Sequence, residues 1–265
     1  GNIGGSLLPR IDEIGARDAV VLELSSAQLH WMDGLRARVA VVTGFEANHL
    51  DWHGGEAHYR DSKRRLLGWM APGSSAVLGP GVRQWPTPAG VDRVDVREAD
   101  ASGLPRLRVP GAHNRVNAAV ARAAAGALDA RADARRIGAA LATFGGLAHR
   151  LCVVGGDEDD GAGAGVRWID DSKSTTAGAM DLAVSAVLED AAARTRSGRI
   201  HLIAGGYDKG APASSFAPAM ARCAQVYLIG ATGPRLAGVC PAGRATVCGT
   251  LGEAVSAVAA RAQPG

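Results

Sequence analysis

Polar and ionisable side chains gather where predicted strands of this 265-residue chain end. Glu23 lies near the end of the apolar run AVVLEL (19–24), and Ser25, Ser26 and Gln28 follow that run. A carboxylate beside hydroxyl groups at the carboxyl end of a strand suits a cation with bound phosphate or carboxylate. The same hydroxyl groups also suit a helix cap, in which Ser25 or Ser26 accepts a hydrogen bond from the backbone. The residues alone leave both interpretations open.

The second predicted strand (38–44) leads into TGFEANHLDWHGG, a segment dense in polar groups. Its polar residues are Asn48, His49, Asp51 and His53. A lone histidine is usually structural. This density directly after a strand, in the same relation to it as the Glu23 cluster, favours a functional site, with His49 as its leading residue.

Lys63 is the third candidate, and it lies in the predicted helix 58–70 among three arginines. A helix with this many basic residues most often presents a solvated face. Composition alone therefore gives Lys63 no functional role.

Three further clusters open helices or end strands. In HNRVN (113–117), Asn114 and Asn117 share one helix face, so their amides can address one ligand edge unless Asn114 caps the helix. The segments WIDDSKSTT (168–176) and LIAGGYDKG (202–210) each bring charged residues to the end of a strand. A helix start after such a strand favours anionic ligands. The charged residues of these two segments are Asp170, Asp171, Lys173, Asp208 and Lys209.

Two other features could suggest a metal site, and the sequence argues against both. The acidic, glycine-rich segment DEDDGAGAG (157–165) is typical of a solvated turn. The four cysteines lack the close pairs that zinc sites use, and they lie in or beside apolar runs. We therefore expect reduced, buried thiols at Cys152, Cys223, Cys240 and Cys248.

Composition excludes several classes of partner. The net charge of +3 is small and the arginines are scattered, so a nucleic-acid surface is not indicated. No apolar run approaches the roughly 18 residues of a membrane helix. No basic-then-apolar targeting segment opens the chain.

Short β-branched runs alternate with helical patterns, which favours an α/β fold with parallel sheets. The predicted strands are 19–24, 38–44, 75–79, 201–206 and 225–230, with strand-like runs at 151–156 and 166–171. The predicted helices are 58–70, 113–128, 132–144, 176–188, 214–223, 233–238 and 251–262. The stretch 80–110 is predicted to hold strands and turns, and a domain boundary is expected near 145–150.

The ordered motifs resemble those of the Mur ligase family. They are GNIG, LELSS-x-Q, NHLDWHG, Y-x-x-x-K, HN-x-x-NA, HRL, DDSK-[SA]-T and AGGYDKG, and together they span essentially all of the chain. The phosphate-loop motif G-x-x-x-x-G-K-[ST] does not occur in the sequence.

The resemblance implies two partial α/β domains. Residues 1–148 would be a central parallel-sheet ATPase domain, and residues 149–265 a Rossmann-like, doubly wound C-terminal domain. A UDP-binding domain and the phosphate loop would precede the chain, and a final strand would follow it. We therefore expect a fragment that has no ligase activity by itself.

The implied activity is the ATP- and Mg²⁺-dependent addition of D-glutamate to UDP-N-acetylmuramoyl-L-alanine, through an acyl phosphate, in peptidoglycan precursor synthesis. The implied protein is a cytoplasmic monomer that binds neither nucleic acid nor membrane. Asn48 and DDSKSTT depart from the family's commonest pattern. An L-glutamate-adding relative is therefore an alternative, and a non-catalytic nucleotide-binding protein is a second one.

The resemblance also implies residue roles. Glu23 and His49 would hold Mg²⁺, and Lys63 would be carbamylated, because an ammonium repels the cation whereas its carbon dioxide adduct is an oxygen ligand. The residues expected at the substrates are Asn2, Ser25 and Gln28 for the muramoyl-alanine group, and Lys173, Thr175 and Lys209 for glutamate. Those expected at the nucleotide are Asn114, Asn117, Arg150 and Asp171, with His149 alongside.

Overall fold

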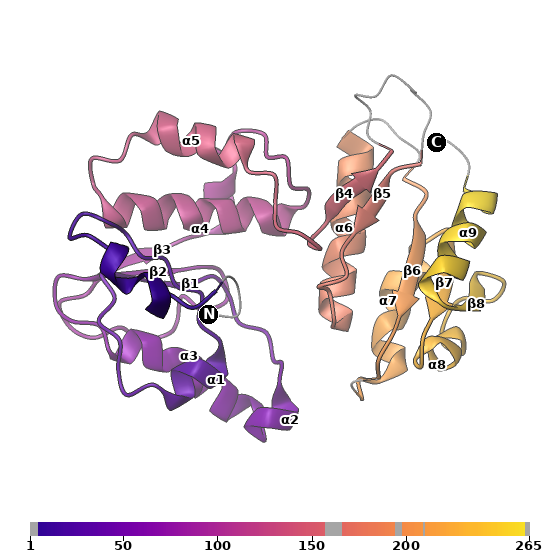
Figure 1. Ribbon diagram of the computed structural model, residues 1–265, viewed down its shortest axis with the longest axis horizontal. Coiled ribbons are helices and arrows are strands. Elements are labelled where there is room, and N and C mark those ends of the chain that lie inside the picture. Colours follow the sequence, from indigo (N-terminus) through magenta and orange to yellow (C-terminus); the bar gives the residue numbers. More distant parts are fainter. Residues whose placement is uncertain (1–4, 157–165, 194–197, 209, 263–265) are drawn as a thin grey trace. The chain divides into compact units, whose positions relative to one another are not determined.

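The computed structural model describes residues 5–156, 166–193, 198–208 and 210–262 (Figure 1). They form two compact units: unit 1 is Gly1–Leu104 with Val116–Ala139, and unit 2 is Pro105–Arg115 with Ala140–Gly265. The domain boundary expected between residues 148 and 149 stays a prediction. The acidic segment 157–165, Asn2 and Lys209 lie outside the described residues.

Unit 1 is built on a three-stranded parallel sheet in the order β1-β2-β3. Its strands are β1 (Val39–Val42), β2 (Ser75–Leu78) and β3 (Asp92–Asp95). Helix α3 (Glu56–Gly68) covers one face of the sheet, and α4 (Ala112–Leu128) covers the other (Figure 1). The shorter elements of this part of the chain are η1 (Leu8–Glu13), α1 (Ser26–Trp31), α2 (Leu50–His53), η2 (Glu98–Ala101) and α5 (Ala134–Thr143).

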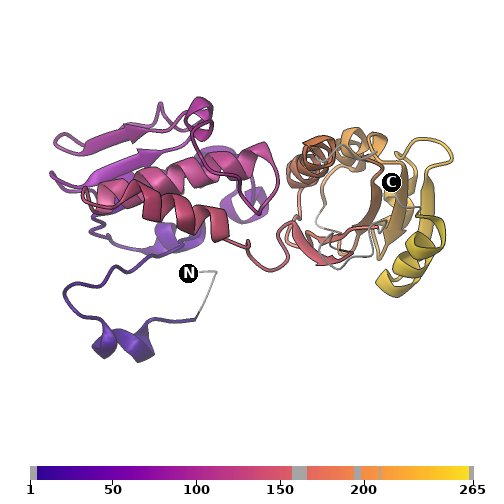
Figure 2. The same ribbon diagram turned by 90° about the horizontal axis from the view of Figure 1, so that it is seen from above.

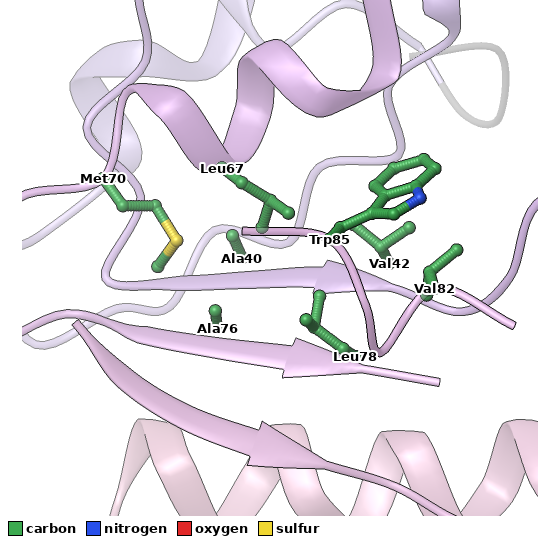
Figure 3. Packing of buried hydrophobic residues seen from close by; sticks show 8 residues of the cluster. All are labelled: Ala40, Val42, Leu67, Met70, Ala76, Leu78, Val82 and Trp85. Atoms are coloured by element: carbon green, nitrogen blue, oxygen red, sulfur yellow. The ribbon is translucent and has the colours of Figure 1, made fainter. Parts of the chain in front are cut away.

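The core on the α3 face joins alternate strand residues to the end of the helix. Ala40 and Val42 point to this face because side chains two positions apart in a strand share a side. Leu67 and Met70 pack on them from the end of α3 and the residues after it (Figure 3). Trp85 closes the cluster beyond the end of β2. This packing fixes α3, and with it Lys63, against the sheet.

Unit 2 contains a second three-stranded parallel sheet, in the order β6-β7-β8. Its strands are β6 (His201–Gly205), β7 (Gln225–Ile229) and β8 (Ala245–Gly249). Helices α6 (Ala177–Ala193), α7 (Ala217–Ala221) and α8 (Gly233–Ala237) lie on one face, and α9 (Leu251–Arg261) lies on the other (Figures 1 and 2). The short helix η4 (Ala213–Phe216) precedes α7.

Alternation along β7 gives this sheet its two cores. Val226 and Leu228 pack with α6, α7 and α8, whereas Tyr227 packs with Ala254 and Val258 of α9. All three β7 side chains are fully buried. Helices on both faces of a parallel sheet confirm the predicted α/β, doubly wound class.

A separate antiparallel hairpin precedes this sheet in the sequence. Its strands are β4 (Cys152–Gly155) and β5 (Trp168–Asp170), and Cys152 pairs with Asp170. The two strand-like runs predicted around the acidic segment are therefore confirmed as strands. Their pairing brings the HRL motif next to the DDSKS motif.

The predicted strand at 19–24 is wrong: this segment forms no strand. Val21 is 90% exposed, and Val20 and Leu22 are 46% and 44% exposed. A strand is defined by hydrogen bonds to a neighbouring strand. Within the part of the chain that the structure describes, β1 pairs with β2, and 19–24 has no partner strand. Most of the apolar side chains of this segment therefore remain exposed.

Three other local differences have simple causes. The predicted helix 214–223 divides into η4 and α7, and Pro218 lies in the first turn of α7. Proline lacks an N–H and suits this position. The sequence also missed α1 and β8, which are only 6 and 5 residues long.

The cysteines are free, as expected. Cys223 is fully buried, and burial raises its thiol pKa to about 11, so this thiol stays protonated and unreactive. The other three are half-buried rather than buried. Among the described residues, no helix is long and apolar enough to cross a membrane.

Candidate active site

The Glu23 segment leads directly into a capped helix. The Ser25 hydroxyl accepts a hydrogen bond from the Gln28 N–H at 3.2 Å, and Gln28 Oε1 accepts one from the Ser25 N–H at 2.9 Å. This reciprocal pair is a capping box. The cap, one of the two interpretations that the sequence left open, is therefore present at Ser25. The substrate roles of Ser25 and Gln28 stay predictions. Glu23 is exposed just before the cap.

His49 occupies a strained turn between β1 and α3. Its φ is 53°, in the left-handed region that few residues other than glycine adopt. Its N–H donates to Asn48 Oδ1 at 2.8 Å, and the residue is exposed. Gly54 is also left-handed, so the single turn α2 is bracketed by two backbone reversals. Strain of this kind occurs often at functional sites.

Lys63 points inward, unlike the arginines beside it. Its Nζ lies 5.1 Å from the centre of the Tyr59 ring, and burial lowers its pKa, although the charge of Glu23 acts in the opposite direction. The neighbouring Arg60 and Arg64 form exposed ion pairs on the surface of α3. The solvated-face interpretation therefore fits the arginines and does not fit Lys63.

Tyr59 contacts several of these candidates, and the sequence gave it no role beyond its place in the Y-x-x-x-K motif. It is 6% exposed, and its ring centre lies 6.3 Å from that of His49 and 5.0 Å from that of His53. The Lys63 ammonium makes a cation–π contact with the same ring. His49 and Lys63 thus both lie beside the Tyr59 ring, and the charge of Glu23 acts on Lys63. The metal roles of these three residues stay predictions. The tyrosine one helical turn before Lys63 was the available signal.

The residues fit a magnesium site only if Lys63 is carbamylated. Among the described residues, no three His, Cys, Asp or Glu side chains are placed to hold a metal ion. Mg²⁺ prefers oxygen ligands and usually keeps water or phosphate oxygens. Glu23 supplies one carboxylate, and a carbamate on Lys63 would supply a second anionic oxygen. The lowered pKa of Lys63 favours the neutral amine, whose nitrogen attacks carbon dioxide and loses a proton to give the carbamate.

The two asparagines of α4 differ in their surroundings. The Asn114 amide donates to the Pro110 carbonyl at 2.7 Å, so it ties the start of α4 to the preceding turn. Asn117 is exposed one turn further along the helix. The structure thus ties the Asn114 amide to a local backbone contact and leaves Asn117 at the surface, and the adenine roles of both stay predictions.

In unit 2, hydrogen bonds tie the HRL motif to the DDSKS motif. His149 Nδ1 lies 2.7 Å from Asp170 Oδ2, and the Leu151 N–H donates to Asp171 Oδ1 at 3.0 Å. The Lys173 N–H donates to the His149 carbonyl at 3.1 Å. Ser174 Oγ also donates to Asp171. His149 and Leu151 both have positive φ, at 64° and 49°.

This arrangement leaves Arg150, Lys173 and Thr175 exposed beside a turn held by protein hydrogen bonds. Two exposed cations on a fixed turn suit an anionic ligand such as phosphate or carboxylate. Asp171 already accepts bonds from the protein through both of its oxygens. Its nucleotide contact, like the roles of His149 and the three exposed residues, stays a prediction.

The pairing of Asp170 gives a testable pH dependence. Hydrogen bonds from the Ser172 backbone and from His149 hold the pKa of Asp170 below its ordinary value. A lowered folded-state pKa stabilises the fold above the unfolded value of about 4, and this stability is lost as pH falls through the folded pKa. Between about pH 4 and pH 2, urea unfolding should show a steeper loss of stability in the parent chain than in Asp170→Asn. Parallel pH profiles for the two proteins would contradict the pairing.

The glycine-rich end of β6 lies in the same unit. Asp208 Oδ1 accepts hydrogen bonds from Arg235 at 2.8 Å and from the Gly210 N–H at 2.8 Å, and Tyr207 is 86% exposed. Lys209 lies outside the described residues, and its expected contact with glutamate stays a prediction.

Comparison with known proteins identifies the family and the fold. Residues 10–85 match the Mur ligase middle domain family. Relatives include UDP-N-acetylmuramoylalanine–D-glutamate ligases of Paramagnetospirillum magneticum, 33% identical over 97% of this chain and 58% of that protein, and of Dinoroseobacter shibae, 32% identical over 100% of this chain and 60% of that protein. The chain therefore spans less than two thirds of the length of the curated relatives it matches.

Solved structures agree on the fold. MurF from Acinetobacter baumannii superposes with a TM-score of 0.62 at 15% identity, over 84% of this chain and 53% of that one. UDP-N-acetylmuramate-alanine ligase MurC from Thermotoga maritima gives a TM-score of 0.54 at 16% identity, over 76% of this chain and 48% of that one. The two parallel sheets, each with helices on both faces, define an α/β protein. Within that class, the chain belongs to the Mur ligase family.

Proposed function

We propose that this chain is the catalytic part of an ATP-dependent ligase that adds D-glutamate to UDP-N-acetylmuramoyl-L-alanine. The observation that carries the proposal is the environment of Lys63. Burial lowers the pKa of this lysine, and the nearby charge of Glu23 acts against that effect. The Lys63 ammonium and the His49 ring both lie beside the ring of Tyr59. A basic surface helix does not require this arrangement. Relatives that are 32–33% identical bear the name of this activity.

Glu23, His49 and a carbamate on Lys63 would hold Mg²⁺ in this proposal. When bound, Mg²⁺ supplies positive charge that offsets the charge of the phosphate oxygens of ATP. Tyr59 would orient the Lys63 side chain and exclude water from one side of it, because its ring is buried against Lys63 and His53.

The reaction would proceed in two transfers. The carboxylate of the muramoyl-alanine substrate attacks the γ-phosphate of ATP, giving an acyl phosphate and ADP. The amine of glutamate then attacks the acyl carbon, and the tetrahedral intermediate collapses to an amide and inorganic phosphate. The protein contributes orientation and the neutralisation of developing negative charge.

The remaining candidates would bind the substrates. Arg150, Lys173 and Thr175, exposed on the turn held by Asp170 and Asp171, would meet anionic groups of the nucleotide and of glutamate. The other residues assigned to substrates and nucleotide are Asn2, Ser25, Gln28, Asn114, Asn117, His149, Asp171 and Lys209. The reaction would take place in the cytoplasm, where ATP and UDP-linked precursors occur, with the enzyme as a monomer.

The experiment that tests this function compares the two enantiomers of glutamate. A protein of the relatives' full length that carries this chain is assayed for phosphate release with ATP, Mg²⁺, UDP-N-acetylmuramoyl-L-alanine and each glutamate. Turnover with D-glutamate alone supports the proposal. Turnover with L-glutamate alone would replace it with the L-glutamate-adding alternative, to which DDSKSTT points. No turnover with either, in a protein that binds ATP, would favour a non-catalytic nucleotide-binding protein. The 265-residue chain by itself is expected to release no phosphate.

A further inference from the structure

His53 is buried at the end of α2, where it links two other helices. It is 6% exposed, with Nε2 2.9 Å from Ser26 Oγ of α1 and Nδ1 2.8 Å from His58 Nδ1 of α3. Burial, followed by the nearby imidazoles, lowers the pKa of His53 and keeps it neutral. A neutral imidazole donates through one nitrogen and accepts through the other. Both nitrogens are therefore satisfied.

These hydrogen bonds join the two segments that carry the proposed cation ligands. Ser26 follows Glu23 by three residues in the sequence. On the other side, the His53 N–H donates to the His49 carbonyl at 3.0 Å, which closes the single turn of α2. A helix this short does not hold its own shape. The place of His49 therefore depends on what fixes the far end of the turn, which is the ring of His53.

We propose that His53 and Ser26 are positioning residues for the cation site: their hydrogen bond sets the spacing between the Glu23 carboxylate and the His49 imidazole. This inference rests on the proposed function, because it takes Glu23 and His49 as ligands. It assigns no contact with the cation to His53 itself.

The packing of the helices has other support, so the effect of this hydrogen bond can be separated from folding. Arg65 donates to the Met32 carbonyl at 2.8 Å, which joins α3 to the end of α1. Leu29 of α1 is 3% exposed. Removal of the Ser26 hydroxyl should therefore loosen the α2 turn and leave α1 packed on α3.

The test is a Mn²⁺ titration of the 265-residue chain with labelled histidine rings, in bicarbonate buffer, observed by NMR. Mn²⁺ broadens the resonances of nearby groups. In the parent chain, the His49 ring should broaden first, while His201, whose Nδ1 lies 3.1 Å from the Tyr227 hydroxyl in unit 2, should stay sharp. In Ser26→Ala, the Mn²⁺ concentration for half-broadening of His49 should rise about tenfold, a loss typical when a residue that orients a ligand is removed. Ser26→Thr, which keeps a hydroxyl, should respond like the parent.

Ser74→Ala is the matched control, because Ser74 is also a buried serine of unit 1 but its hydroxyl bonds locally to the Ala71 carbonyl. It should leave the Mn²⁺ response unchanged. His53→Phe is a second variant that fills the site without hydrogen bonds, and it should show the same loss as Ser26→Ala. A folded Ser26→Ala or His53→Phe chain with the parent's response would overturn the positioning role and leave the cation site standing. A parent chain in which Mn²⁺ does not broaden His49 would overturn the cation site itself.

Discussion

Replacement of Lys63 by alanine should abolish ligase activity in a protein of the relatives' full length, with a fall in kcat of at least about 100-fold. The physical reason is the loss of an anionic oxygen at the proposed cation site, which Glu23 and His49 alone do not complete. The environment favours this chemistry, because burial against Tyr59 lowers the pKa of Lys63 and leaves more neutral amine to react with carbon dioxide. Acetate or bicarbonate added to Lys63→Ala should restore part of the activity by entering the space left by the side chain.

Two further measurements separate this role from a general effect of charge. Chains equilibrated with ¹³C-bicarbonate should show a carbamate carbon by NMR in the parent and none in Lys63→Ala. The matched control is Arg64→Ala, the next residue on the same helix, which forms an exposed pair with Asp61. This variant should keep nearly full activity, because exposed ion pairs contribute little. Full activity of Lys63→Ala without any additive would exclude the carbamate.

Substitution of Gly205 by alanine should unfold unit 2 far more readily than the same substitution at Gly206. Both glycines have positive φ, at 127° and 129°, so alanine is strained at either position. Only at Gly205 would the added Cβ also meet the chain, at 2.1 Å from the Ile229 carbonyl oxygen of β7. At Gly206 the added Cβ would have no other heavy atom of the described structure within 4 Å, apart from those of its chain neighbours.

The two variants therefore separate strain from collision. We expect Gly206→Ala to lower the free energy of unfolding by about 1–3 kcal/mol, the usual cost of a strained backbone. Gly205→Ala should cost at least about 2 kcal/mol more, because β6 must move away from β7. Hydrogen exchange of the β6 and β7 amides in increasing urea measures both values. Equal stability of the two variants would show that the strands move apart at little cost.

The sequence predicted most regular elements because their patterns are local. The strands around Val41 and Val77 follow from runs of β-branched and small residues, and helix α4 follows from its alanine-rich composition. The order of the motifs along the chain also indicated the Mur ligase family. The segment 19–24 has the same kind of composition but forms no strand, because pairing depends on a neighbouring strand that no local pattern supplies.

The candidate site divides in the same way. The sequence determined which segments are dense in polar residues, so Glu23, His49 and the DDSKS motif were all identified there, although the segment of Glu23 forms no strand. It could not decide whether Lys63 faces solvent or what the buried ring of His53 contacts. Those answers depend on pairs far apart in the chain, such as Ser26 with His53 and Glu23 with Lys63. Periodicity records which face of an element is apolar, whereas burial and hydrogen-bond partners are set only when the elements pack together.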